Sequence, residues 1–184
     1  MFKNASPVTM FLLSAFVLLM GVYLHVQTRK YGAGLGQEMI SGTVPDFTWQ
    51  DFNGKSHDIK ELKGRTLVIH FWASWCGPCR KEFPSLLATA KADKDVTFLT
   101  ISGDDTLASA EKFVEQSQKD ANAKDLPNVL YAFDPEKKVA FDIFQTAVYP
   151  ESILVDKTQQ MHHKFPGAVD WQSAEVQDAL KSVK

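Results

Sequence analysis

Residues 72–84 read WASWCGPCRKEFP and contain both cysteines of the 184-residue chain, Cys76 and Cys79. The run TLVIHF at 66–71 comes directly before them and is typical of a buried strand. Pro78 lies between the cysteines and is expected in the first turn of a helix, where its missing N–H costs nothing. A strand that leads into a CxxC pair at the start of a helix is typical of a thiol–disulfide exchange site.

The spacing of the two cysteines gives them different chemical tasks. A sulfur at a helix N-terminus lies near unpaired N–H groups and the positive end of the helix dipole, and both stabilise a thiolate. Cys76 is therefore the predicted nucleophile. Cys79 follows one helical turn later and is predicted to resolve the mixed disulfide that Cys76 forms.

Two structural roles are the alternatives for this pair. A staple between the cysteines would close a four-residue loop and stabilise the fold by only about 2 kcal/mol. A structural zinc ion normally takes four Cys or His ligands, and the chain has no second cysteine pair. The adjacent His162 and His163 fall on a predicted strand, where neighbouring side chains face opposite sides. The sequence therefore predicts no metal site and favours a redox role.

The motif WCGPC, followed by Pro84 five residues after Cys79, resembles the active-site signature of thioredoxins. The longer pattern FWASWCxxCxxEFP at 71–84 is similar to the membrane-anchored, extracytoplasmic branch of that superfamily, the TlpA, ResA and DsbE (CcmG)-like thiol–disulfide oxidoreductases. The resemblance covers about residues 43–184. It implies an α/β, thioredoxin-like fold, in which helices flank a central mixed sheet, with an N-terminal β-hairpin extension and an insertion at about 104–135.

The rest of the chain predicts the elements of such a sheet. Apolar and polar residues alternate around an Asn53-Gly54 turn, which indicates a hairpin. Asp134 and Pro135 are typical of the N-cap and first position of a helix. Strands are expected at 96–102, 129–133, 152–156 and 160–165, and helices at 106–119, 135–144 and 171–183. Strands that alternate with helices indicate an α/β sheet.

The resemblance adds a second group of residues to the site. Pro150 matches the cis-proline of thioredoxin-like proteins, and the backbone of Tyr149 before it would pair with an extended substrate. Trp75, Gly77 and Pro78 complete the expected substrate-binding surface. From the residues alone, the alternative for Pro150 is an ordinary proline at a strand entrance.

Three ionisable residues are candidates for moving protons at the thiols. Glu82 lies one helical turn after Cys79 and matches an active-site acid of ResA-like reductases, where it would accept the proton of Cys79. Glu151 follows Pro150 as in the Pro-Glu-Thr of cytochrome c maturation reductases, and an acid beside thiols raises their pKa or accepts a proton. His70 stands where thioredoxins carry a buried aspartate. The alternatives are solvated acids for the two glutamates and a satisfied core residue for the histidine.

A membrane anchor is expected near the N-terminus. Residues 8–26 read VTMFLLSAFVLLMGVYLHV, without Asp, Glu, Lys or Arg. A run of this length is long enough to cross the hydrocarbon core as a helix. A cleaved signal peptide is the alternative, but no small-x-small cleavage site follows the run closely.

Charge alone leaves the orientation of this anchor open, because Lys3 lies on one side and Arg29 and Lys30 on the other. The resemblance places residues 1–7 in the cytoplasm. Residues 27–42 then form a linker. The catalytic domain, at 43–184, is expected on the periplasmic side of the cell inner membrane.

These features predict a reductase of protein disulfides, because the Gly-Pro dipeptide between the cysteines is that of thioredoxin. The chain has no further cysteine and no cofactor motif, so the resemblance implies re-reduction by a membrane electron donor of the CcdA/DsbD type. Apocytochrome c is the most specific expected substrate. The alternatives are a general disulfide oxidase or isomerase of the cell envelope and a copper(I)-handling protein. A net charge of −2 gives no nucleic-acid footprint.

Overall fold

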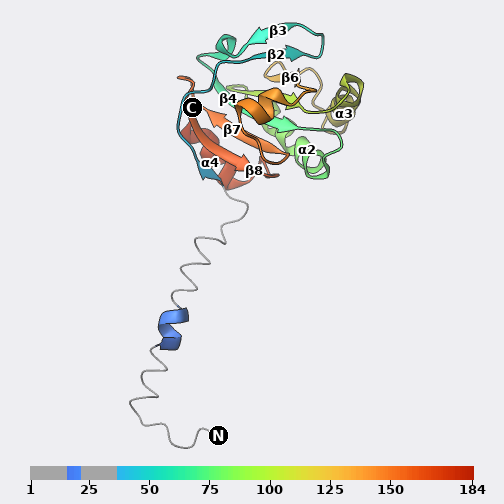
Figure 1. The fold of residues 1–184 in the computed structure, drawn as a ribbon. Coiled ribbons are helices and arrows are strands. Elements are labelled where there is room, and N and C mark those ends of the chain that lie inside the picture. Colours follow the sequence, from blue (N-terminus) through green and yellow to red (C-terminus); the bar gives the residue numbers. More distant parts are fainter. Residues whose placement is uncertain (1–15, 22–36) are drawn as a thin grey trace, which may run out of the picture. The chain divides into compact units, whose positions relative to one another are not determined.

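The structure is a computed structural model that describes residues 16–21 and 37–184 (Figure 1). Residues 16–21 are helical and exposed. Within these two ranges, no helix has the length and apolar character that crossing a membrane requires. The predicted anchor at 8–26 is described only at 16–21. The predicted cytoplasmic segment 1–7 and most of the predicted linker 27–42 lie outside the described residues.

One mixed sheet of eight strands, in the order β1-β8-β7-β4-β5-β6-β2-β3, forms the centre of the domain. The strands are β1 (Glu38–Met39), β2 (Thr48–Asp51), β3 (Ser56–Asp58), β4 (Thr66–Trp72), β5 (Val96–Ser102), β6 (Val129–Phe133), β7 (Glu151–Val155) and β8 (Met161–Pro166). The strands β4, β5 and β6 are parallel, whereas β7 pairs antiparallel with both β4 and β8. Every residue of β4 and β5 is buried, which fits the mainly apolar and β-branched residues of these two strands.

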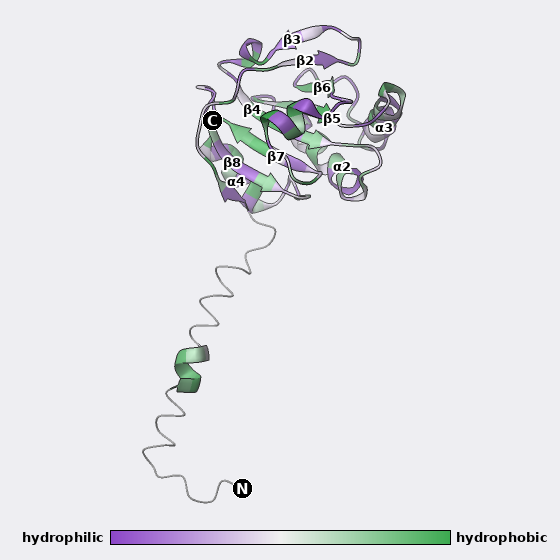
Figure 2. Cartoon of the chain, viewed as in Figure 1, coloured by the Kyte–Doolittle hydropathy of each residue, from purple (hydrophilic) through white to green (hydrophobic). Residues whose placement is uncertain are grey.

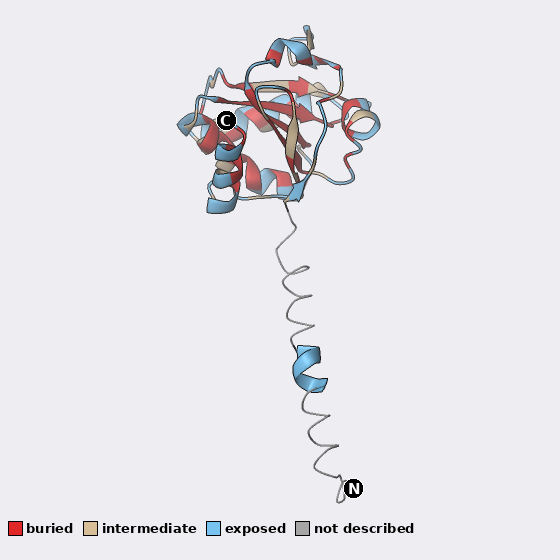
Figure 3. Cartoon of the chain, turned by 90° about the vertical axis from the view of Figure 1, so that its left-hand side faces the viewer, coloured by how far each residue is buried: buried red, intermediate tan, exposed pale blue. Residues whose placement is uncertain are grey.

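Helices cover the sheet on both sides. They are α2 (Gly77–Ala92), α3 (Leu107–Asp120) and α4 (Ala174–Ser182), with two short helices, η1 (Ile59–Leu62) and η2 (Lys138–Ile143). Because successive residues of a strand point to opposite faces, Trp72 packs in the core with α2, α3 and α4, and Phe71 packs in the core with η1 and η2. The central strands are hydrophobic in Figure 2 and buried in Figure 3.

The predicted α/β architecture is confirmed, with strand limits within one or two residues of those expected. The hairpin at Asn53-Gly54 joins β2 to β3. The expected insertion at 104–135 supplies α3 and β6, and β6 joins the hairpin to the central sheet by pairing with β2 and β5. The short strand β1 was not expected, and it pairs with the outer strand β8.

The helix predicted at 135–144 is wrong in its start and in its type. A π-helix runs over Lys138–Ile143 instead, after Lys137 in a left-handed conformation with φ of 57°. Asp134 does not cap an α-helix at Pro135. Its carboxylate reaches further along the chain and accepts the N–H groups of Lys138 at 3.0 Å and Ala140 at 3.1 Å. The tight turn at 134–137 delays the helix, and this carboxylate holds its first residues in place.

The last helix is shorter than the predicted 171–183. It begins at Ala174, after Ser173, whose hydroxyl accepts the N–H of Val176. Trp171 precedes the helix and is fully buried. The indole therefore anchors the approach to α4 in the core.

Replacing Asp134 tests what holds η2 in place. Asp134→Ala leaves the buried N–H of Ala140 without its acceptor, so we expect the free energy of unfolding to fall by about 1–3 kcal/mol. Chemical denaturation measures this change, and Asp142→Ala, which removes an exposed carboxylate of the same helix, serves as the control. Equal losses in the two variants would contradict the assigned role of Asp134.

Candidate active site

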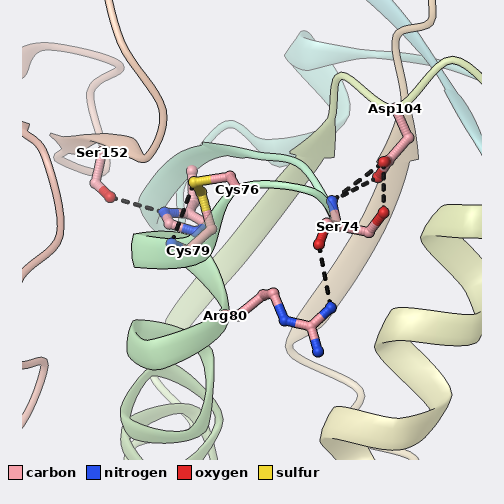
Figure 4. Close-up of a disulfide and its surroundings, with 7 residues drawn as sticks. Ser74, Cys76, Cys79, Arg80, Asp104 and Ser152 are labelled. Atoms are coloured by element: carbon pink, nitrogen blue, oxygen red, sulfur yellow. Dashed lines mark hydrogen bonds between the residues drawn. A yellow bond between two sulfur atoms is a disulfide. The ribbon is translucent and has the colours of Figure 1, made fainter.

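Cys76 and Cys79 form a disulfide at the N-terminus of α2 (Figure 4). Cys76 is the N-cap residue, and its sulfur accepts the N–H of Cys79 at 3.2 Å. Pro78 occupies the first turn and Pro84 lies inside the helix. A reactant can reach the disulfide only through Cys76, because Cys76 is 5% exposed and Cys79 is fully buried.

A buried carboxylate, Asp104, fixes the loop between β4 and α2. It accepts the N–H of Ser74 at 2.9 Å and the hydroxyl group of Ser74 at 2.7 Å (Figure 4). It also accepts the hydroxyl group of Ser102 at 2.8 Å. Asp104 follows the end of β5, and the parallel pairing of β4 and β5 brings the carboxyl ends of both strands together. The sequence analysis missed this residue. The signal was an acid two residues after the end of a buried parallel strand, where functional groups of α/β sheets gather.

The residues of the expected substrate-binding surface surround Cys76. Trp75, Gly77 and Pro78 are exposed on the loop and first turn beside it. The Tyr149–Pro150 peptide bond is cis. The Trp75 and Tyr149 ring centroids are 6.0 Å apart, so the two loops meet at the site.

The ring of Tyr149 lies across Gly103. A Cβ atom at Gly103 would come within 2.4 Å of the Tyr149 hydroxyl oxygen and within 2.8 Å of its ring. The hydroxyl is buried without a hydrogen-bond partner in the described part of the chain. Burial, and then the nearby carboxylates of Asp134 and Asp104, raise the pKa of Tyr149. The missing side chain of Gly103 thus creates the space in which the ring is held.

Glu82 is a buried acid, one helical turn after Cys79. Its Oε1 accepts the indole N–H of Trp171 at 2.5 Å, and its Oε2 has no partner among the residues described. Burial raises the pKa of Glu82 to about 8, against the lowering effect of the hydrogen bond from Trp171. Most of the Glu82 side chains therefore carry a proton at neutral pH. The alternative of a solvated surface acid does not fit this environment.

His70 is a neutral core residue on the face of the sheet that Glu82 and Trp171 also occupy. Its Nδ1 lies 2.8 Å from the hydroxyl of Ser152, and its ring centroid is 6.3 Å from that of Trp171. Burial lowers the pKa of His70 to about 3, so the imidazole stays uncharged near neutral pH. Its Nε2 has no hydrogen-bond partner within 37–184 or 16–21.

Glu151 lies on the other face of the sheet. It is paired in register with Phe71, whose side chain packs in the core with η2, whereas His70 points to the opposite side. The buried carboxylate accepts the hydroxyl of Thr146 at 2.8 Å and forms an ion pair with Lys164 at 3.0 Å. The structure therefore separates Glu151 from the environment that Glu82 and His70 share.

The raised pKa of Glu82 predicts how stability depends on pH. Between its ordinary value of 4.5 and about 8, the carboxyl keeps its proton in the folded protein and loses it in the unfolded chain. The unfolded state then binds fewer protons, so this group makes the free energy of unfolding fall as pH rises through that range. Relative to Glu82→Gln, the wild-type protein should lose stability between pH 5 and pH 8, as denaturation at both pH values will measure. Glu111→Gln, at an exposed acid on α3, should not change the pH dependence.

A double-mutant cycle tests the packing of Tyr149 on Gly103. Gly103→Ala should lower the free energy of unfolding by about 1–3 kcal/mol, because the new methyl group overlaps the phenol ring. In a Tyr149→Ala background the same substitution should cost much less. If the two effects simply add, the ring does not depend on the space at Gly103.

Comparison of the chain with known proteins identifies its family. The chain matches the Redoxin family over residues 40–182. The thiol-disulfide oxidoreductase ResA of one Bacillus cereus strain is 30% identical over 130 residues, which are 70% of each chain. ResA of a second Bacillus cereus strain is 33% identical over 153 residues, or 78% of each chain.

Solved structures share the fold. A secreted Mycobacterium tuberculosis disulfide oxidoreductase, homologous to E. coli DsbE, superposes with a TM-score of 0.61 at 22% identity, over 74% of this chain and 95% of that one. The pneumococcal exposed lipoprotein thioredoxin Etrx1 from Streptococcus pneumoniae gives a TM-score of 0.57 at 25% identity, over 75% and 99%. With its CxxC disulfide and its ResA-like relatives over most of its length, the chain belongs to the Redoxin family and is a thiol–disulfide oxidoreductase.

Proposed function

We propose that the protein is an extracytoplasmic reductase of protein disulfides and that its substrates are apocytochromes c or related envelope proteins. The observation that carries this proposal is the asymmetry of the disulfide: Cys76 reaches the surface at a helix N-terminus, and Cys79 is buried behind it, one turn from a protonated acid, Glu82. A site built in this way attacks with one sulfur and resolves with the other.

The reaction begins with the reduced dithiol. The Cys76 thiolate attacks one sulfur of the substrate disulfide, the substrate S–S bond breaks, and the departing substrate thiolate takes up a proton. The Cys79 thiolate then attacks the Cys76 sulfur of the mixed disulfide and releases the second substrate thiol. The substrate gains two electrons and two protons, and the enzyme is left with the Cys76–Cys79 disulfide that the structure contains.

Proton transfer at the buried sulfur is assigned to Glu82. Cys79 has no exposed surface, so its proton must pass to a neighbouring group rather than directly to water. Glu82 lies on the same helix one turn away. With a pKa of about 8, a minor fraction of its carboxyl groups is ionised near neutral pH, and this carboxylate form accepts the proton of Cys79. His70 is less suited to this task, because burial lowers its pKa to about 3 and its imidazole does not hold an accepted proton near neutral pH.

The reducing direction and the location are parts of the same proposal. The sequence between the cysteines, Gly77-Pro78, is that of thioredoxin, and the chain has no third cysteine to restore its dithiol. A membrane donor of the CcdA/DsbD type would supply the electrons, and the apolar run at 8–26 would anchor the chain at the inner membrane, with the catalytic domain in the periplasm.

Trapping the mixed disulfide tests the proposal. Cys79→Ala in the full-length protein should leave substrates covalently held by Cys76, and mass spectrometry of the trapped species should find apocytochromes c joined through a haem-attachment cysteine. The matched control is Cys76→Ala, which should trap little because Cys79 is buried. Recovery of only unrelated envelope proteins would contradict the apocytochrome assignment. A reduction potential near the strongly oxidising end, about −120 mV, would contradict the reducing direction.

A further inference from the structure

A groove between α2 and α3 opens at the loop that precedes the disulfide. Its volume is about 410 Å³, and residues of both helices line it together with Ser74 of that loop. The two helices pack through Phe83 and Phe113, whose ring centroids are 5.1 Å apart, and the ring of Phe113 also lines the groove. Small-molecule sites in proteins have volumes of about 300–1,000 Å³, so the groove has the size of such a site.

The charged side chains of the groove are separated along its length. Because α2 links β4 to β5 and α3 links β5 to β6, and these strands are parallel, both helices begin at the edge of the sheet that carries the disulfide. Arg80 lies in the first turn of α2 and Lys112 in the second turn of α3, so both cations lie toward this edge. Asp120, at the far end of α3, is the one acid among the described residues that line the groove. The end of the groove beside the disulfide is therefore positive, and the N-termini of the two helices add to this charge.

The two cations are available to bind an anion. Arg80 donates one N–H to the carbonyl oxygen of Ser74 at 3.4 Å (Figure 4). Its guanidinium carbon lies 5.8 Å from the centre of the Phe113 ring. These two contacts hold the guanidinium at the groove and leave most of its N–H donors without an acceptor in the part of the chain that the structure describes. Within that part, neither Arg80 nor Lys112 forms an ion pair with a carboxylate. A guanidinium held in this way can bind a carboxylate through two parallel hydrogen bonds.

We infer that this groove binds the carboxylate of small acidic thiols, and that Cys76 reduces the disulfides of such thiols in addition to protein disulfides. The inference rests on the proposed function and adds a second substrate class to it. Only one residue separates Ser74 from Cys76, so their Cα atoms lie within about 7 Å of each other. A small molecule can therefore place its carboxylate at Arg80 while its sulfur reacts with Cys76.

Arg80 and Lys112 have a definite task in this reaction. An acidic disulfide and the Cys76 thiolate are both negative and repel each other as they approach. The two cations offset this repulsion by pairing with the carboxylate. The Cys76 thiolate then attacks one sulfur of the small disulfide, the S–S bond breaks, and the first small thiol leaves with a proton. The Cys79 thiolate attacks the Cys76 sulfur and releases the second thiol, so two electrons and two protons pass from the dithiol to the small disulfide.

Two matched small disulfides test this inference. One is the disulfide of N-acetylcysteine, which carries carboxylates, and the other is the disulfide of N-acetylcysteine amide, which is uncharged. The measured quantity is the second-order rate constant with which each disulfide oxidises the reduced full-length protein. The ratio of the two constants, acid over amide, measures the effect of the carboxylate. This ratio should fall roughly 2- to 5-fold in Arg80→Gln and in Lys112→Gln, which is the effect expected for one partly exposed ion pair.

Lys81→Gln is the matched control. Lys81 is the exposed neighbour of Arg80 on α2 but does not line the groove, so this substitution removes the same charge from the same turn and should leave the ratio nearly unchanged. Equal falls in Arg80→Gln and Lys81→Gln would indicate a general electrostatic effect and would overturn the groove as a binding site. An unchanged ratio in Arg80→Gln or Lys112→Gln, or no reduction of either disulfide, would also overturn the inference. The trapping experiment on Cys79→Ala tests the reductase proposal separately, so that proposal can stand when this inference fails.

Discussion

The parallel pairing of β4 with β5 is the constraint on which the active site depends. It places the carboxyl ends of two buried strands side by side, so the CxxC loop leaves the sheet next to the segment Gly103-Asp104. That segment has two tasks. The Asp104 carboxylate fixes the loop before Cys76, and the bare backbone of Gly103 makes room for Tyr149. A shift in this strand pair would disturb the nucleophile and the substrate-binding loop together.

The sheet also separates the three ionisable residues that the sequence suggested as proton carriers, because Glu82 and His70 lie on one face and Glu151 lies on the other. His70 and Phe71 are neighbours on β4, yet their side chains lie on opposite faces. Glu82 shares the face of His70, in an apolar environment that keeps its proton. Glu151 shares the face of Phe71, where Lys164 and Thr146 satisfy its charge. The two faces of the sheet thus keep the protonated Glu82 apart from Glu151, which contacts Lys164 and Thr146.

Much of this arrangement could be predicted from local patterns. The largely apolar run of β4 predicted a buried strand, and the positions of Cys76 and Cys79 after it predicted both the start of α2 and the site. The remainder depends on contacts between distant segments, which a linear pattern does not carry. The Asp134 carboxylate accepts the N–H of Ala140 at the start of the π-helix, and Glu82 accepts the indole N–H of Trp171, 89 positions later. Asp104 was visible only as an acid after a strand, a signal that needs the strand order to be interpreted.

The hydrogen bond between Glu82 and Trp171 also bears on how the protein matures. The disulfide, its loop and the first turn of α2 come from one short stretch, whereas the indole that shelters the acid is made much later in synthesis. A chain that has not yet reached residue 171 already contains both thiols, but its Glu82 lacks the indole N–H that it accepts in the folded protein. The dithiol is therefore made before the hydrogen bond to its acid can form, and the site is complete only once the C-terminal segment has packed against α2.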